Sequence, residues 1–115
     1  MEASMIILIK LIVNAIAIFL TAQILPGVEL ANLTTALLVA IVLAGINMFI
    51  KPIVLIFTLP INVITLGLFT FVINGLFILL ASNIVDGFNV PNFWHAILFA
   101  LVLSIVNSFL VWIVK

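Results

Sequence analysis

Charged residues are so few and so widely spaced that they dictate where this chain can fold. The six charges are Glu2, Lys10, Glu29, Lys51, Asp86 and Lys115. They leave uncharged runs at 11–28, 30–50, 52–85 and 87–114, which are 18, 21, 34 and 28 residues long. A helix needs about 20 apolar residues to cross the hydrocarbon core of a bilayer. The spacing of the charges therefore predicts an integral membrane protein.

The composition excludes several other classes of protein. Hydrophobic residues make up 69% of the 115 residues and charged residues 5%, whereas soluble domains are roughly half apolar and about a quarter charged. A net charge of zero gives no attraction for nucleic acid. The absence of cysteine excludes disulfides and thiolate metal sites. The runs are apolar on every side, without the alternation of a membrane β-barrel.

The pattern predicts an all-α membrane protein with four spans in one transmembrane domain over residues 5–115. The expected spans are 5–25, 33–51, 64–85 and 92–113. Pro26-Gly27 separates the first span from the second, and Asp86-Gly87 separates the third span from the fourth, because such dipeptides favour turns.

The middle run is too long for one span, and its prolines leave two interpretations open. Pro52 and Pro60 each lack an N–H and disfavour helix in the preceding residue. Residues 52–63 then form a separate short segment, either interfacial or re-entrant. Alternatively, the second span continues, kinked, to about Thr58.

The lysines predict the orientation of the chain. With four spans, Lys10, Lys51 and Lys115 fall on one side of the membrane, and Glu29 and Asp86 on the other. Positive charge collects on the cytoplasmic side. We therefore expect a multi-pass membrane protein with both termini in the cytoplasm.

A shift of 60 residues aligns the chain with itself without a gap. Residues 11–50 and 71–110 share 13 identities in 40, including Asn14 with Asn74, Asn32 with Asn92 and Asn47 with Asn107. This similarity predicts two parallel two-span repeats, at about 5–54 and 65–114, related by a pseudo-twofold axis along the membrane normal.

Small residues recur every four positions on the second and fourth spans. These are Ala36, Ala40 and Ala44, followed in the second half by Ala96, Ala100 and Ser104. Small residues at this spacing let helix backbones approach closely in lipid. We expect them at helix contacts, either within the chain or between the subunits of a homo-oligomer.

Four asparagines and two lysines are the polar residues expected inside the membrane. They are Asn14, Asn47, Asn74 and Asn107, with Lys10 and Lys51 one turn from an asparagine. The amides serve either as interhelical hydrogen-bonding groups or as the lining of a polar path or hydrated vestibule. The lysines fit that vestibule, and they fit equally well with snorkelling to the interface.

No pattern in the sequence points to an enzyme or a cofactor site. Ser82, Asp86 and His95 could be imagined as a hydrolase triad, but no nucleophile elbow surrounds the serine. His95 is the only histidine and lacks the companions that zinc needs. Phosphate-loop, dinucleotide and zinc-protease motifs are missing as well.

The segment from Gly45 to Phe69 carries a family resemblance. It contains an asparagine four residues before Lys51-Pro52, then Thr-Leu-Pro-Ile-Asn ending at Asn62, then Thr-Leu-Gly-Leu-Phe around Gly67. With Pro26-Gly27 and the run from Gly87 to Val90, this pattern resembles the phage holin superfamily IV, or YvlD-like, proteins of bacterial membranes. The resemblance covers the chain from Met5 and assigns the turn motif to Pro52, Pro60, Asn62 and Gly67. The resemblance implies a small four-span protein of the bacterial inner membrane and no catalytic residues.

Three functions remain open at this point. The first is a non-enzymatic, self-associating protein that forms holin-like pores or lesions. The second is a structural or regulatory protein of the envelope-stress response that binds lipid or a protein partner. The third is a small-solute channel, which intramembrane charge would favour.

Overall fold

A computed structural model describes residues 2–65 and 67–114 of the chain. It contains helix α1 (Glu2–Ile24), strand β1 (Glu29–Leu30), helix α2 (Leu33–Gly45) and the π-helical turn η1 (Ile46–Ile50). Helices α3 (Lys51–Ile64) and α4 (Phe69–Ile84), strand β2 (Phe88–Asn89) and helix α5 (Phe93–Val114) follow. Because α2, η1 and α3 follow one another without a break, the described residues form four helical rods.

Three of these rods are long and apolar enough to cross a membrane. They are Glu2–Ile24, Leu33–Ile61 and Phe93–Ile113. Helix α4 is apolar but has only 16 residues, or about 24 Å at 1.5 Å per residue. The prediction of a helical membrane protein is confirmed, although the third rod is shorter than the expected span of 64–85.

The prolines of the middle run do not break the helix, which corrects the prediction of a separate segment at 52–63. Pro52 is the second residue of α3, which follows directly on η1, and the Lys51 N–H donates to the Ile46 carbonyl, five residues back. Proline removes a hydrogen bond and its ring crowds the carbonyl four residues earlier, and a π turn shifts the preceding carbonyls to make room. Pro60 lies inside α3. The alternative of a second span that runs on is the correct one, and it continues as far as Ile64.

The turn into the third rod lies later than expected. Thr65 caps α3, its Oγ accepts a hydrogen bond from the Phe69 N–H at 3.3 Å, and Gly67 adopts a φ of +85°. That left-handed conformation favours glycine, so α4 begins only at Phe69. The backbone of Asn62 belongs to α3, while its side chain lies outside the described part.

The four rods are tied together at the end where the two long loops meet. Strands β1 and β2 pair antiparallel there, with Glu29 opposite Asn89 and Leu30 opposite Phe88. This short ladder was not foreseen from the sequence. Phe88 of this ladder and Phe99 of α5 are fully buried and pack edge to face, with ring centroids 5.4 Å apart.

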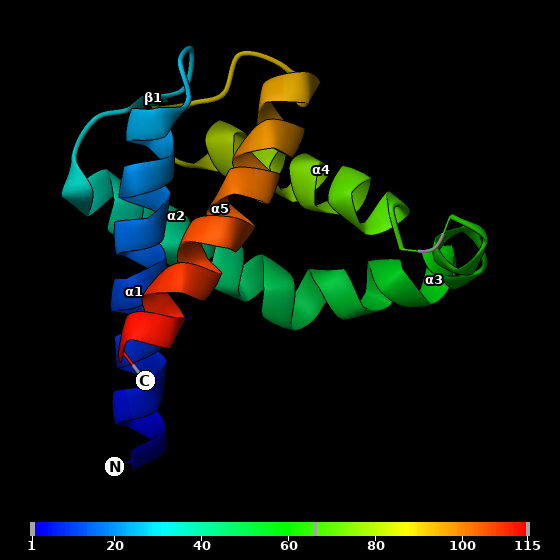
Figure 1. Ribbon diagram of the computed structural model, residues 1–115, viewed down its shortest axis with the longest axis horizontal. Helices are drawn as coiled ribbons and strands as arrows, with labels where there is room; N and C mark the ends of the chain where they lie inside the picture. The colour runs from blue at the N-terminus through cyan, green and yellow to red at the C-terminus, as the bar shows by residue number, and fades with distance from the viewer. Residues whose placement is uncertain (1, 66, 115) are drawn as a thin grey trace.

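The rods diverge away from this closed end. Figure 1 shows α1 and α5 running together toward the two termini, while α3 and α4 form an arm that points in another direction. The buried core lies toward the closed end, within residues 13–22 of α1, 35–46 of α2 and η1, 73–81 of α4 and 96–100 of α5. Most side chains of α3 and of the N-terminal part of α1 are exposed. The fold is therefore closed at one end and open at the other.

Candidate polar cleft

The open end contains a cleft of about 260 Å³ that all four rods line. Each rod contributes one amide: Asn14 from α1, Asn47 from η1, Asn74 from α4 and Asn107 from α5. Lys51 and Ser104 complete the polar lining. The cleft therefore gathers all four asparagines that the sequence singled out, and one of the two lysines.

None of the four amide side chains forms a hydrogen bond with another group in residues 2–65 and 67–114. Asn14, Asn74 and Asn107 are partly buried and Asn47 is exposed. The Oδ1 atom of Asn107 is the one side-chain oxygen or nitrogen in this part of the chain that is buried without a partner. A buried acceptor left without a donor costs about 1–3 kcal/mol. The cleft is thus suited to water or to a polar ligand.

Local structure explains how Asn47 and Lys51 reach the cleft. Both belong to the turn where the helix changes from α to π and back, four residues apart on one face. Turns of this kind often lie at functional sites. The corresponding part of α5 is regular helix, since Trp112 stands there instead of a proline.

The small residues of α2 and α5 divide into two groups. Ala36, Ala40, Ala96 and Ala100 are buried within the chain, with exposed fractions of 0%, 1%, 0% and 8%. Ala44 is partly buried and Ser104 is exposed, and both line the cleft. In this conformation only the second group is open to a neighbouring molecule. A role in subunit contact stays a prediction.

One close helix contact was missed in the sequence. A Cβ atom added to Gly75 on α4 would lie 2.8 Å from Cγ1 and 3.3 Å from Cα of Ile97 on α5. Gly75 therefore sets the distance between these two helices. The residue 60 positions earlier, Ala15, is also small and buried. The alignment of the two halves could therefore have indicated a close helix contact at Gly75.

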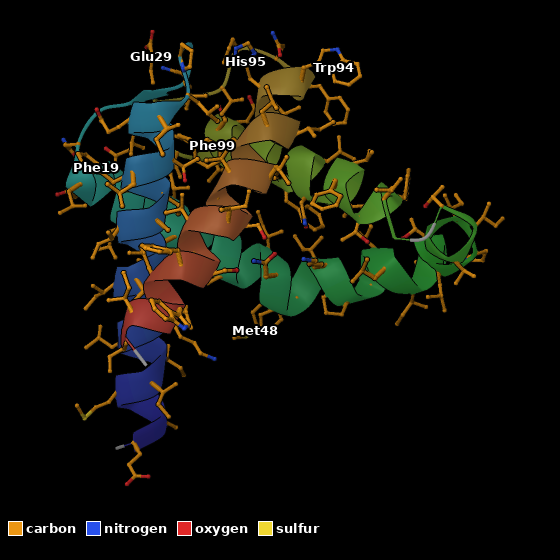
Figure 2. All side chains as sticks on the ribbon, viewed as in Figure 1. Phe19, Glu29, Met48, Trp94, His95 and Phe99 are labelled. Atoms are coloured by element: carbon orange, nitrogen blue, oxygen red, sulfur yellow. The ribbon has the colours of Figure 1, made fainter. Side chains whose placement is uncertain are left out.

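Two residues of the imagined hydrolase triad, Ser82 and His95, form hydrogen bonds within the second loop and at the start of α5. The hydroxyl of Ser82 donates to the Phe88 carbonyl at 2.9 Å and accepts from the Val90 N–H at 3.1 Å, which fixes the second loop. Asn92 Oδ1 accepts from the His95 N–H at 2.9 Å and caps α5. No group of three or more histidine or acidic side chains gathers in the described residues. Figure 2 shows His95 and Glu29 at the closed end, away from the termini.

Three long apolar helices and a fourth short one around a cleft with four amides define a small multi-pass membrane protein. More particularly, the chain belongs to the family described as "Mycobacterial 4 TMS phage holin, superfamily IV", whose model matches residues 5–109.

Two relatives agree with this assignment. The chain is 39% identical over 110 residues to an uncharacterized protein of Streptomyces coelicolor, covering 87% of this chain and 88% of that protein. It is 32% identical over 98 residues to the uncharacterized membrane protein YvlD of Bacillus subtilis, covering 84% and 82%. No solved structure matches the chain.

Proposed function

We propose that this chain is a non-enzymatic protein of the bacterial inner membrane whose copies associate and permeabilise the bilayer in the manner of a holin. One observation carries the proposal: each of the four rods turns an unpartnered amide into the same cleft. Amides without partners are unfavourable in lipid, so this lining favours a hydrated interior. The family assignment agrees with such a role.

The cleft of one chain is partly open and has a volume of about 260 Å³. We infer that one copy does not supply a path across the bilayer. Polar linings conduct water and ions when they continue from one face of a membrane to the other. Several copies that bring their clefts together would extend the lining. Self-association is therefore part of the proposal.

The short rod α4 supports a disturbance of the bilayer around the protein. At about 24 Å it falls short of the ~30 Å hydrocarbon core. A spanning helix that is too short is accommodated by local thinning of the bilayer or by association. Either response favours the opening of a lesion.

The proposal includes the two parallel repeats, at about 5–54 and 65–114. Several pairs of residues 60 positions apart share their structural roles. Gly27 and Gly87 both have a positive φ, of 91° and 93°, and Asn32 and Asn92 both cap a helix. The β-ladder pairs Glu29 with Asn89, its own counterpart. Burial also follows the repeat, since Ile18 and Ile78 are buried, as are Val39 and Phe99.

The orientation is testable because the chain has no cysteine of its own. Cysteines introduced at Ser4 and at Asn89 are both exposed in the fold. If both termini face the cytoplasm, an impermeant thiol reagent added to intact cells or spheroplasts labels the cysteine at 89 and leaves the one at 4 unlabelled. Equal labelling at both positions would contradict the proposed orientation.

Dye release from liposomes tests permeabilisation. We expect the purified wild-type protein to release an entrapped dye, with a rate that rises steeply with the protein-to-lipid ratio because several copies must meet. Replacing both Asn47 and Asn74 by leucine removes two hydrogen-bonding groups from the lining, so water is excluded and the rate of dye release should fall by about tenfold. Asn83→Leu is the matched control, because Asn83 is an exposed residue of α4 outside the cleft. Liposomes that stay tight at high loading with wild-type protein would contradict the proposed function.

A further inference from the structure

A second cavity adjoins the polar cleft on the side of the chain termini. It is a groove of about 470 Å³ between α1 and α5, and its lining includes Ile6 and Val111. Asn14 and Asn107 line the groove and the cleft alike, and the cleft continues along α1 to Ile18. From the end where the termini lie (Figure 1), the groove therefore comes first and leads toward the cleft.

The charged side chains that line these two cavities are both positive. Lys10 lines the groove and Lys51 lines the cleft. The chain has three acidic side chains, Glu2, Glu29 and Asp86, and none of them lines either cavity. Within residues 2–65 and 67–114 neither lysine forms an ion pair. The lining of the two cavities therefore carries positive charge that no carboxylate balances.

The amides of the cleft suit an ion of either sign, so the lysines decide which sign is favoured. An asparagine side chain offers a carbonyl oxygen as acceptor and two N–H groups as donors. An anion in the cleft would accept from these N–H groups, while water would donate to the buried Oδ1 of Asn107. A cation would find the amide oxygens, but the like charge of Lys51 would repel it. The lining thus favours a small anion such as chloride over K⁺.

We propose that the path formed by associated copies prefers small inorganic anions to cations, and that Lys51 determines this preference. The inference rests on the proposed function, because one chain alone does not supply a path. Copies that bring their clefts together would each contribute one Lys51 to the shared lining. A ring of lysines is an arrangement that makes pores selective for anions. Lys10 adds positive charge on the side of the termini.

The width of a holin-like lesion makes this preference depend on salt. A fixed charge acts on passing ions over one Debye length, which is about 30 Å at 10 mM salt, 10 Å at 0.1 M and 3 Å at 1 M. A lesion that lets a dye pass is wider than a channel whose walls contact each ion. The anion preference should therefore be clear in dilute salt and disappear near 1 M, whereas a narrow filter would stay selective in concentrated salt.

The reversal potential of planar bilayers that contain the whole chain tests the proposal. Under a KCl gradient between roughly 10 mM and 100 mM, where screening is weak, we expect Cl⁻ to permeate about five times as readily as K⁺. Lys51→Gln should abolish the preference, and Lys51→Glu should reverse it in favour of K⁺. Lys51→Arg keeps the positive charge and should restore the preference for Cl⁻.

Ser4→Asp is the matched control for the loss of positive charge. It lowers the net charge by the same amount as Lys51→Gln, at an exposed position of α1 that lines neither cavity, so the preference for Cl⁻ should remain. Equal loss of the preference in Ser4→Asp and Lys51→Gln would assign it to the charge of the whole surface and overturn the inference.

The remaining outcomes separate this inference from the proposed function. A wild-type current that favours K⁺, or neither ion, in dilute salt would overturn the anion preference and leave permeabilisation standing. An unchanged preference in a conducting Lys51→Gln variant would overturn the role of Lys51. A bilayer that never conducts at high protein loading would overturn the proposed function, and this inference with it.

Discussion

Gly75→Leu should strongly destabilise the fold. The added side chain begins 2.8 Å from Ile97 Cγ1 and 3.3 Å from the Ile97 backbone, so α4 must move away from α5. Overpacking of this kind typically costs 1–3 kcal/mol, and we expect about 3 kcal/mol because backbone atoms are involved. The loss is measurable as a shift in unfolding by sodium dodecyl sulfate in mixed micelles, followed by circular dichroism.

Gly45→Leu is the matched control for this experiment. Gly45 is the last residue of α2, and a Cβ atom added there meets nothing within 4 Å. A leucine at this position should change the free energy of unfolding by less than about 0.5 kcal/mol, as is usual for substitutions away from packed contacts. Equal changes in the free energy of unfolding at the two glycines would mean that leucine affects helix stability in the same way at both positions. They would contradict a close contact between α4 and α5 at Gly75.

The first and last helices could be predicted from the sequence because single apolar runs encode them. The expected span 5–25 corresponds to α1 (Glu2–Ile24), and the span 92–113 to α5 (Phe93–Val114). Both are bounded by turn residues and helix caps that act locally. The boundaries of these helices next to the loops can therefore be predicted without knowledge of the fold.

The middle of the chain was predicted less well because proline has two outcomes in a helix. It either ends the helix or is absorbed by a distortion, and here η1 absorbs Pro52. The choice depends on what surrounds the turn. The sequence alone does not contain that information, so the second rod is longer and the third shorter than expected.

The members of the polar cleft were predicted, but their arrangement was not. The four asparagines are conspicuous because they interrupt apolar runs. These asparagines come together because of the angles at which the rods leave the closed end. Tertiary contacts such as the Phe88–Phe99 pair determine those angles. The close contact at Gly75 was missed because a single glycine does not form a repeating pattern of small residues along the helix.

Ser104→Leu should shift the protein from oligomer toward monomer. Of the small residues on α2 and α5, Ala40 and Ala100 are covered by the chain itself, so leucine there disturbs the subunit before any contact between subunits. Ser104 is exposed at the cleft, beside the partly buried Ala44. In lipid, association depends on close packing of small residues and on polar contacts, and these two positions offer both.

We expect wild-type protein in mild detergent to have a mass several times that of the 12.5 kDa chain, as measured by light scattering coupled to size-exclusion chromatography. A leucine at Ser104 holds the backbones apart, and a loss of about 1.4 kcal/mol would weaken the association tenfold. Ile105→Leu is the control, because it conserves volume at a neighbouring position that is 62% exposed. A wild type that is monomeric across detergents would exclude self-association. An unchanged oligomer in Ser104→Leu would instead place the subunit contact on the apolar faces outside the cleft, and the clefts of neighbouring copies would then not form a shared path.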